Sequence, residues 1–263
     1  MAKYRTVFLS DTHNGAWGSK TGNATLFITR NEFEELHLVG DIFDFWAILR
    51  KIHWSEACNT FIQKVLRIAR AGKNVYYEPG NHDEIMKRFD GYDFGNIHVR
   101  VHHIHITKDG KRYLVTHGDQ FDLVVTKAKW LAKVGAVAYD KLIWLNHWVE
   151  IVRGWLGLPA WSFSKFIKHR VKQAVAYMND YEEALAQVAR DHKCQGIICG
   201  HIHHPEDKMI GDIRYLNCGD WVESLSVVVE HLDGRLEVLV FGPAGFKEEQ
   251  CSTSTDVLDA SAS

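Results

Sequence analysis

Short apolar runs and one amphipathic stretch alternate along the first part of the chain, and each run ends at a cluster of polar residues. Runs rich in β-forming residues predict strands at Tyr4–Ser10, Leu36–Val39 and Val75–Tyr77. From Trp54 to Ala71, apolar residues recur at helical spacing until Gly72 stops the pattern. This alternation of strand and helix predicts an α/β fold with its functional site at the carboxyl ends of the strands.

The pattern continues through the rest of the chain. Ile97–Thr107 is rich in β-branched residues, and Asp109-Gly110 turns it back into a strand at Arg112–Thr116. Its histidines 98, 102, 103 and 105 are expected on the polar face of that strand. Gln173–His192 predicts a helix. Further strands are predicted at Gly196–Cys199, Arg214–Cys218, Ser224–His231 and Leu236–Phe241, the last two joined as a hairpin by Asp233-Gly234.

Residues 122–170 differ from their surroundings, with five of the nine tryptophans and a net charge of +5. Their pattern is helical, and it predicts a helical insertion that covers the site as a lid; two ordinary core helices are the alternative. Tryptophan, lysine and arginine together also suit a lipid interface. We therefore expect a core of residues 1–121 and 171–242, a lid of residues 122–170, and a disordered tail of residues 243–263.

Composition excludes several classes of protein. The formal net charge of the 263 residues is only -2, so no nucleic-acid partner is expected. Five cysteines without a C-x-x-C motif argue against a disulfide framework and fit a reducing compartment. Because the first residues lack a signal-peptide pattern and no run of 18 apolar residues occurs, a cytoplasmic location is expected.

Five loops, each directly after a predicted strand, carry carboxylate, amide or imidazole side chains. A single D-x-H or G-H-x-H motif carries little information, but five such loops in one chain are poorly explained by chance. Oxygen and imidazole ligands without thiolates select Mn, Fe, Zn or Mg-like ions. The candidate metal ligands are Asp11, His13, Asp41, Asn81, His117, His201 and His203.

The spacing of these ligands suggests two divalent ions. Two neighbouring cations need a bridging anion, and Asp41 is the natural one. We expect Asp11, His13 and His203 to complete one site, and Asn81, His117 and His201 to complete the other. Such a pair, with its ions roughly 3.5–4 Å apart, activates water for in-line attack on phosphorus.

Two further residues are candidates for catalysis. His82 directly follows a ligand, so we expect it to face the leaving oxygen as a general acid or charge stabiliser, with Asp44 holding its tautomer. The alternative for this pair is a hydrogen bond that only closes the loop.

The motifs D-x-H, G-D-x-x-D, G-N-H-D, a later lone histidine and G-H-x-H occur here in order, between Thr6 and about Asp220. In this the chain resembles the calcineurin-like metallophosphoesterases. The resemblance implies a four-layer αββα sandwich with a dinuclear site, and it agrees with the ligands assigned above.

Within that family, the Trp-rich insertion and the segment Asn217–Val222 are similar to the UDP-2,3-diacylglucosamine pyrophosphatase group. That resemblance implies cleavage of a nucleotide-linked lipid to UMP and a lipid sugar 1-phosphate, usually with Mn²⁺, at the inner face of the bacterial membrane. It gives the lid the role of housing acyl chains. Arg88, Lys87 and Lys168 are candidates for contacting phosphate, with a solvated surface role as the favoured alternative for each taken singly. Known members of the group carry Arg where this chain has His82, which leaves the substrate open.

Two other functions stay open on the sequence alone. One is a soluble phosphodiesterase or phosphomonoesterase with a different substrate. The other is a scaffold without catalytic activity, which the complete set of seven candidate ligands disfavours.

Overall fold

The computed structural model describes residues 1–121, 180–242 and 245–247. The chain divides into two compact units, one formed by Met1–Asp119 with Ala186–Ser263 and the other by Gln120–Leu185. The fold and the site described below belong to the first unit. The lid expected at residues 122–170 lies outside the described residues, and so does most of the expected tail.

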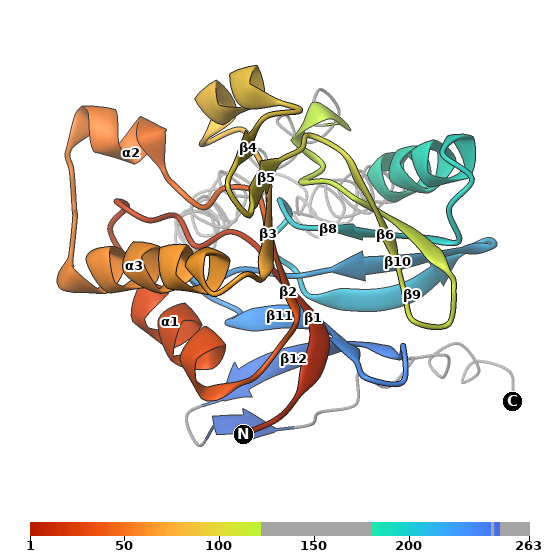
Figure 1. Cartoon of the computed structure of the whole chain (residues 1–263). Helices are drawn as coiled ribbons and strands as arrows, with labels where there is room; N and C mark the ends of the chain where they lie inside the picture. Colours follow the sequence, from red (N-terminus) through yellow and green to blue (C-terminus); the bar gives the residue numbers. More distant parts are fainter. Residues whose placement is uncertain (122–179, 243–244, 248–263) are drawn as a thin grey trace, which may run out of the picture. The chain divides into compact units, whose positions relative to one another are not determined.

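Two sheets build the first unit (Figure 1). The larger has the order β13-β12-β11-β1-β2-β3-β5-β4, in which β1, β2, β3 and β5 run parallel. The smaller has the order β6-β7-β8-β10-β9, with β7, β8 and β10 parallel between two antiparallel edge strands. The strands of the larger sheet are β1 (Tyr4–Leu9), β2 (Glu35–Val39), β3 (Asn74–Glu78), β4 (Asp93–Phe94), β5 (Ile97–Val99), β11 (Ser226–His231), β12 (Leu236–Gly242) and β13 (Gly245–Lys247). Those of the smaller sheet are β6 (His103–Ile106), β7 (Arg112–Val115), β8 (Gly196–Cys199), β9 (Glu206–Ile210) and β10 (Ile213–Asn217).

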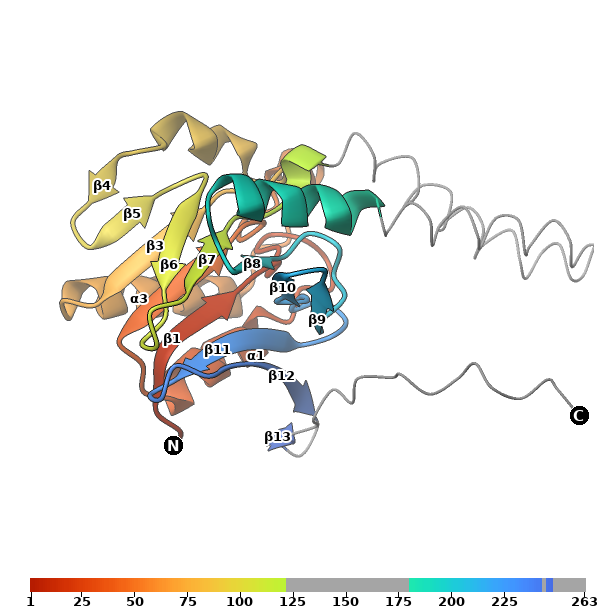
Figure 2. The same ribbon diagram turned by 90° about the vertical axis from the view of Figure 1, so that its right-hand side faces the viewer.

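Helices lie on the outer faces of the sheets. α1 (Thr21–Arg30) and α3 (Glu56–Arg70) pack together against the larger sheet, and residues 186–191, the end of a further helix, lie beside the smaller one (Figure 2). α3 confirms the predicted helix, and Gly72, with a φ of 86°, follows its end. Sequence reasoning missed α1 and the short α2 (Phe45–Arg50); η1 (Glu84–Phe89) and η2 (Asp119–Phe121) are 3₁₀ turns.

The alternation of side chains along the strands separates two cores. On β1 and β2, Val7 and Leu36 face the helices and pack with Phe27 of α1 and Phe61 of α3. Phe8, the neighbour of Val7, faces the opposite way into the space between the sheets. Each such buried side chain contributes about 1.5–3 kcal/mol relative to an exposed one. The result is a layered α/β sandwich, in which the carboxyl ends of the parallel strands form one edge.

The strands predicted before Asp41 and at Gly196–Cys199 are confirmed, and the β11–β12 hairpin turns at Gly234 as expected. The single strand predicted at Ile97–Thr107 is wrong, because β5 and β6 belong to different sheets. The prediction that His105 lies on the polar face of a strand is also wrong. The His105 side chain is only 2% exposed and lies between the sheets, where its Nε2 is hydrogen-bonded to Glu230. Within the expected tail, Gly245–Lys247 forms β13 and pairs with β12.

No helix among the described residues is long and apolar enough to cross a membrane. The four cysteines in this part of the chain, Cys58, Cys194, Cys199 and Cys218, are buried thiols without disulfide bonds.

Candidate metal centre

The candidate ligands converge at the edge where the parallel strands of both sheets end. Asp11 and His13 follow β1, Asp41 follows β2 and Asn81 follows β3. His117 follows β7, and His201 with His203 follows β8. The loops after β1 and β2 continue as a paired backbone, because the amides of Asp11 and His13 donate to the carbonyls of Gly40 and Asp41 at 3.0 and 2.9 Å. Residues distant in sequence thereby become neighbours.

Five of these ligand residues have a left-handed backbone. The φ angles are 53° at Asp11, 46° at His13, 53° at Asp41, 70° at His201 and 58° at His203. L-residues rarely adopt this region, although Asp and His tolerate it better than most. Such strain costs on the order of 1–3 kcal/mol per residue, and its concentration at one edge points to a functional site.

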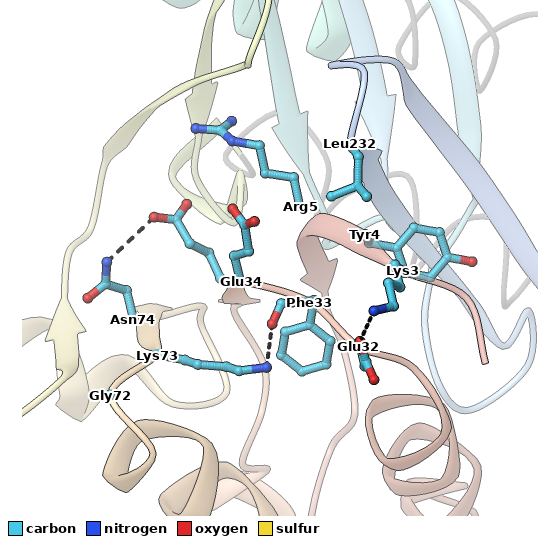
Figure 3. A pocket seen from close by; sticks show the side chains of 11 residues that line it. Lys3, Tyr4, Arg5, Glu32, Phe33, Glu34, Gly72, Lys73, Asn74 and Leu232 are labelled. Carbon is cyan, nitrogen blue, oxygen red and sulfur yellow. Dashed lines mark hydrogen bonds and ion pairs between the residues drawn. The ribbon is translucent and has the colours of Figure 1, made fainter.

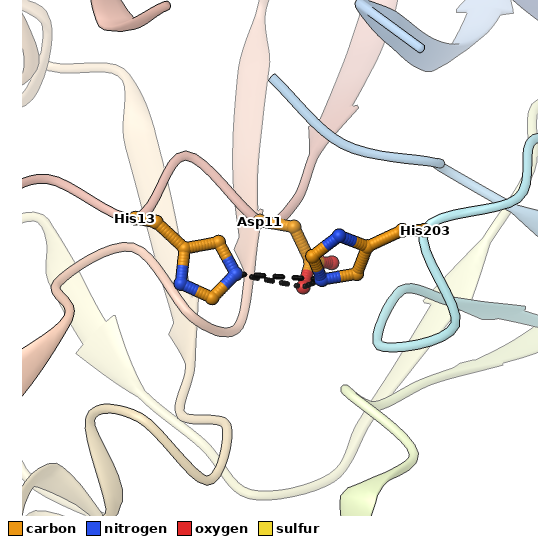
Figure 4. A group of neighbouring side chains, drawn as sticks. All are labelled: Asp11, His13 and His203. Atoms are coloured by element: carbon orange, nitrogen blue, oxygen red, sulfur yellow. Dashed lines mark hydrogen bonds and ion pairs between the residues drawn. The ribbon is translucent and has the colours of Figure 1, made fainter. Parts of the chain in front are cut away.

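One group of ligands contains Asp11, His13 and His203, whose donor atoms lie within 4.8 Å of one another. Figure 4 shows both imidazoles turned toward the Asp11 carboxylate. Asp11 Oδ1 is 3.0 Å from His203 Nε2 and 3.6 Å from His13 Nε2. The other carboxylate oxygen accepts from the His201 amide at 2.9 Å and from the Ser10 hydroxyl, so the carboxylate cannot turn away.

A second group contains Asp41, His117 and His201. His117 Nδ1 donates to the Val39 carbonyl at 2.9 Å, which leaves Nε2, 3.3 Å from Asp41 Oδ2, as the nitrogen that could bind a metal ion. Gly40 makes this close approach possible, since a Cβ at that position would lie 2.2 Å from His117 Nδ1. His13 Nε2 is also 3.9 Å from Asp41 Oδ2, so the two groups are contiguous.

The charges of the site reinforce one another. Burial raises the pKa of both Asp11 and Asp41, but the neighbouring histidines outweigh it, so the pKa of Asp11 lies well below its usual value and that of Asp41 is lowered to about 2. Burial lowers the pKa of His13 and His117, but nearby carboxylates outweigh it and raise both values to about 10. Asp11 and Asp41 act on both histidines, Asp44 on His13 and Asp119 on His117. Asp11 and Asp41 are therefore negatively charged, and their charge favours a cation at this edge.

The donors fit divalent cations. Carboxylate, amide and imidazole groups supply the hard and borderline ligands that such ions prefer. Asn81 Oδ1 is buried and accepts no hydrogen bond from the described residues, as expected of an oxygen that faces a metal.

His82 and Asp44 lie beside these ligands. His82 Nδ1 is 2.9 Å from Asp44 Oδ1, and the His82 ring packs against Trp46 with centroids 4.2 Å apart. Asp44 also caps α2 by accepting from the Ala47 amide at 2.7 Å, and its Oδ2 is 3.3 Å from His13 Nδ1. Since His82 also lies within 4.8 Å of His13 and Asp41, it borders the metal centre itself.

Sequence reasoning missed the residue that ties the loops after β2 and β3 together. Asp83 is fully buried and accepts from the amides of Gly80 and Ile42, at 2.6 and 2.9 Å, and from the Tyr77 hydroxyl. Burial, aided by the charge of Asp41, raises the pKa of Asp83. The motif G-N-H-D contained the signal, because its last position repeats the acidic chemistry of the other loops.

The candidate phosphate-binding residues are less well defined. Arg88 lies exposed on η1, while the Lys87 ammonium forms an ion pair with Asp119. Lys168 lies outside the described residues. Asp220, whose Oδ2 is 3.7 Å from His203 Nδ1, is a further carboxylate behind the ligands.

An α/β sandwich with aspartates and histidines gathered at the strand ends is the architecture of a metal-dependent hydrolase. The chain belongs to the calcineurin-like phosphoesterase family, whose family profile matches residues 4–205. This membership confirms the resemblance found in the sequence and implies divalent metal ions at the site.

Curated relatives are similar over most of the chain at low identity. A protein of Porphyromonas gingivalis named UDP-2,3-diacylglucosamine hydrolase is 25% identical over 224 residues, covering 80% of this chain and 84% of the relative. A protein of Aeromonas salmonicida with the same name is 25% identical over 232 residues, covering 85% and 89%. A solved structure of a hypothetical protein from Pyrococcus horikoshii matches with a TM-score of 0.50 at 8% identity, covering 91% of this chain and 88% of that one. The last match concerns the fold alone.

Proposed function

We propose that this phosphoesterase hydrolyses the pyrophosphate bond of UDP-2,3-diacylglucosamine, or of a similar nucleotide-diphospho lipid, to UMP and a lipid sugar 1-phosphate. The observation that carries the proposal is the pair of contiguous ligand groups at the strand ends, one around Asp11 and one around Asp41. The relatives named UDP-2,3-diacylglucosamine hydrolase support this choice of substrate.

In this proposal the seven ligands hold two divalent ions, with Mn²⁺ the expected metal. Asp41 would be the ligand that both ions share, because its Oδ2 lies 3.9 Å from His13 Nε2 and 3.3 Å from His117 Nε2. Ions of this kind supply charge neutralisation at phosphorus and an activated water. Asn81 contributes its side-chain oxygen, which has no other described partner.

His82 acts at the leaving oxygen, and Asp44 orients it. The close contact of Nδ1 with Asp44 Oδ1, at 2.9 Å, orients the ring and leaves Nε2 for the substrate. A positioned imidazole contributes about 10²–10⁴-fold through proton transfer. The same Asp44 carboxylate also approaches the ligand His13, so one side chain orients both a metal ligand and the general acid His82.

The lid, residues 122–170, is proposed to house the acyl chains, with Lys168 and Arg88 near the phosphates. A cytoplasmic protein in peripheral contact with the inner membrane would meet such a substrate where it resides. The alternative is a soluble phosphodiesterase or phosphomonoesterase, which would use the same metal centre on a substrate without acyl chains.

The test is hydrolysis of UDP-2,3-diacylglucosamine with Mn²⁺, with products identified by mass spectrometry. UMP and the acylated sugar 1-phosphate are expected from the wild type. If the lipid stays intact while an aryl phosphodiester is cleaved, the soluble phosphodiesterase is correct and the lipid substrate is wrong.

Three variants separate the roles. Asp41→Ala should abolish both turnover and metal binding, since it removes the bridge. His82→Ala should lower turnover about 10²-fold or more while metal content stays near wild type. The matched control is His204→Ala, which removes an exposed imidazole directly after a ligand and should leave both quantities unchanged. Loss of metal in His82→Ala would show that its role is ligation.

A further inference from the structure

A second histidine cluster lies between the two sheets, away from the strand ends. His37 of β2 is fully buried and His105 of β6 is 2% exposed. Their rings come from different sheets, with centroids 5.5 Å apart. His37 lies within β2, which ends at Val39, and neither histidine of the cluster belongs to the ligand groups around Asp11 and Asp41. The cluster is therefore distinct from the metal centre described above.

Each of these histidines is held by a buried glutamate side chain at one ring nitrogen. His37 Nδ1 is 2.7 Å from Glu78 Oε1, and His105 Nε2 is 2.7 Å from Glu230 Oε2. Both glutamates are fully buried. In protein metal sites a carboxylate commonly receives the N–H of a ligating histidine, which fixes the tautomer and raises the basicity of the other nitrogen.

A third donor residue, Glu35 of β2, lies close to both histidines. One donor atom from each of Glu35, His37 and His105 lies within 4.8 Å of the others. His105 Nδ1 is 3.9 Å from Glu35 Oε2. His37 Nε2 is buried and forms no hydrogen bond with any described residue. A buried ring nitrogen without a partner is destabilising, and a bound ion would supply that partner.

Solvent reaches the cluster through Glu35, whose side chain is 27% exposed. This residue lines a surface pocket of about 590 Å³ together with Arg5 and Asn74 (Figure 3). The Arg5 guanidinium binds both oxygens of Glu230 at 2.8 Å, so its charge is already neutralised. The pocket offers a path for an ion and room for a water ligand.

We propose that Glu35, His37 and His105 form a separate binding site for Zn²⁺ or a similar divalent transition-metal ion, which ties β6, the edge strand of the smaller sheet, to β2 of the larger sheet. The proposal does not depend on the function proposed above.

The ligand set and geometry suit this metal. Two imidazoles and one carboxylate, with a fourth position left to water, are a known donor set for zinc. Tetrahedral bonds of about 2.0–2.1 Å place donor atoms roughly 3.3 Å apart. The separation of 3.9 Å between His105 and Glu35 must shorten by only about half an ångström, which rotation of the partly exposed glutamate can supply. The two histidines keep the orientation that their carboxylates impose.

The experiment compares Glu35→Ala with Glu34→Ala, a matched control in which an exposed neighbour on the same segment is truncated. Each protein is stripped of metal, dialysed against buffered Zn²⁺, and its zinc content is measured by mass spectrometry. The wild type and Glu34→Ala should each hold one equivalent more than Glu35→Ala at a free Zn²⁺ concentration that saturates the wild type. Turnover of an aryl phosphodiester should be equal in all three.

A second measurement uses the wild type alone, so it does not depend on the folding of any variant. Anomalous scattering at the zinc absorption edge should show an ion within bonding distance of His37 and His105. Equal zinc content in Glu35→Ala and the wild type, or no anomalous peak at these nitrogens, would overturn the proposal. Glu34 and Glu35 lie away from the candidate metal centre, so the difference in zinc content between their variants does not depend on catalytic activity. The absence of phosphoesterase activity would therefore refute the proposed function without refuting this site.

Discussion

A substitution at Gly80 can perturb the candidate metal centre without removing any of its ligands. The glycine directly precedes Asn81, and a Cβ built on it would lie 2.2 Å from Asp41 Oδ1 and 2.6 Å from His117 Cδ2. Ordinary van der Waals contact needs at least 3.4 Å, so Gly80→Ala must displace the Asp41 carboxylate or the His117 ring by about 1 Å. The substitution thus acts on two ligands at once.

The size of the effect follows from the tolerance of metal sites. Ligand distances in such sites hold to about ±0.2 Å, which is far less than this displacement. A misplacement of about 1 Å in a catalytic site costs on the order of 10²-fold in rate. We therefore expect Gly80→Ala to lose at least about 10²-fold in turnover and part of its Mn²⁺, while overpacking lowers stability by about 1–3 kcal/mol.

The assay is hydrolysis of an aryl phosphodiester with added Mn²⁺, together with metal content and a thermal unfolding curve. Gly22→Ala is the control, because Gly22 is exposed on α1 and its added Cβ would meet only Ala57 at 3.9 Å. It should keep wild-type turnover and a stability within about 0.5 kcal/mol. Wild-type turnover and metal content in Gly80→Ala would refute the placement of Asp41 and His117 around one ion.

Three further predictions concern charge and metal at the same edge. Asp44→Asn keeps a good cap for α2 but removes the negative charge that His82 and His13 face. Turnover, measured by kinetics, and Mn²⁺ affinity, measured by calorimetry, should each fall about 10–100-fold. Unchanged values would show that Asp44 does not orient both histidines. His13 and His117, whose pKa values are raised to about 10, are protonated at neutral pH without metal, so Mn²⁺ binding should release protons and strengthen as pH rises. Equal binding heats in buffers of different ionisation enthalpy would contradict this. Chelation should lower the unfolding midpoint, since metal at 100 times its dissociation constant stabilises the fold by about 2.7 kcal/mol; an unchanged midpoint would mean that the ions bind the unfolded chain equally well.

The ligand loops could be predicted because the information they need is local. Each has a short apolar strand followed at once by a polar motif, as in Leu36–Val39 before Asp41, and parallel strands bring their carboxyl ends to one edge. The same reasoning failed where pairing depends on distant residues. β5 and β6 are separated by only three residues yet join different sheets, and no periodicity in Ile97–Thr107 marks that change.

The burial of His105 is a further case of non-local control. Its sequence context, alternating histidines, is typical of a solvated strand face. Its partner Glu230 is 125 residues away, and Glu230 also binds Arg5 and the Lys108 amide. A polar side chain can be buried when such a network satisfies it, and that condition is visible only in three dimensions. The second histidine cluster could therefore not be found from spacing.

Backbone strain distinguishes the edge that carries the metal centre. Of the seven residues other than glycine with positive φ in the described part of the chain, five are candidate ligands. Backbone hydrogen bonds hold this geometry, such as those from the amides of Asp11 and His13 to the neighbouring loop. Because these hydrogen bonds join backbone groups of neighbouring loops, we expect the loops to keep their arrangement when the metal is removed. Removal of metal should accordingly weaken the fold without unfolding it, in contrast to small domains whose structure forms only around the ion.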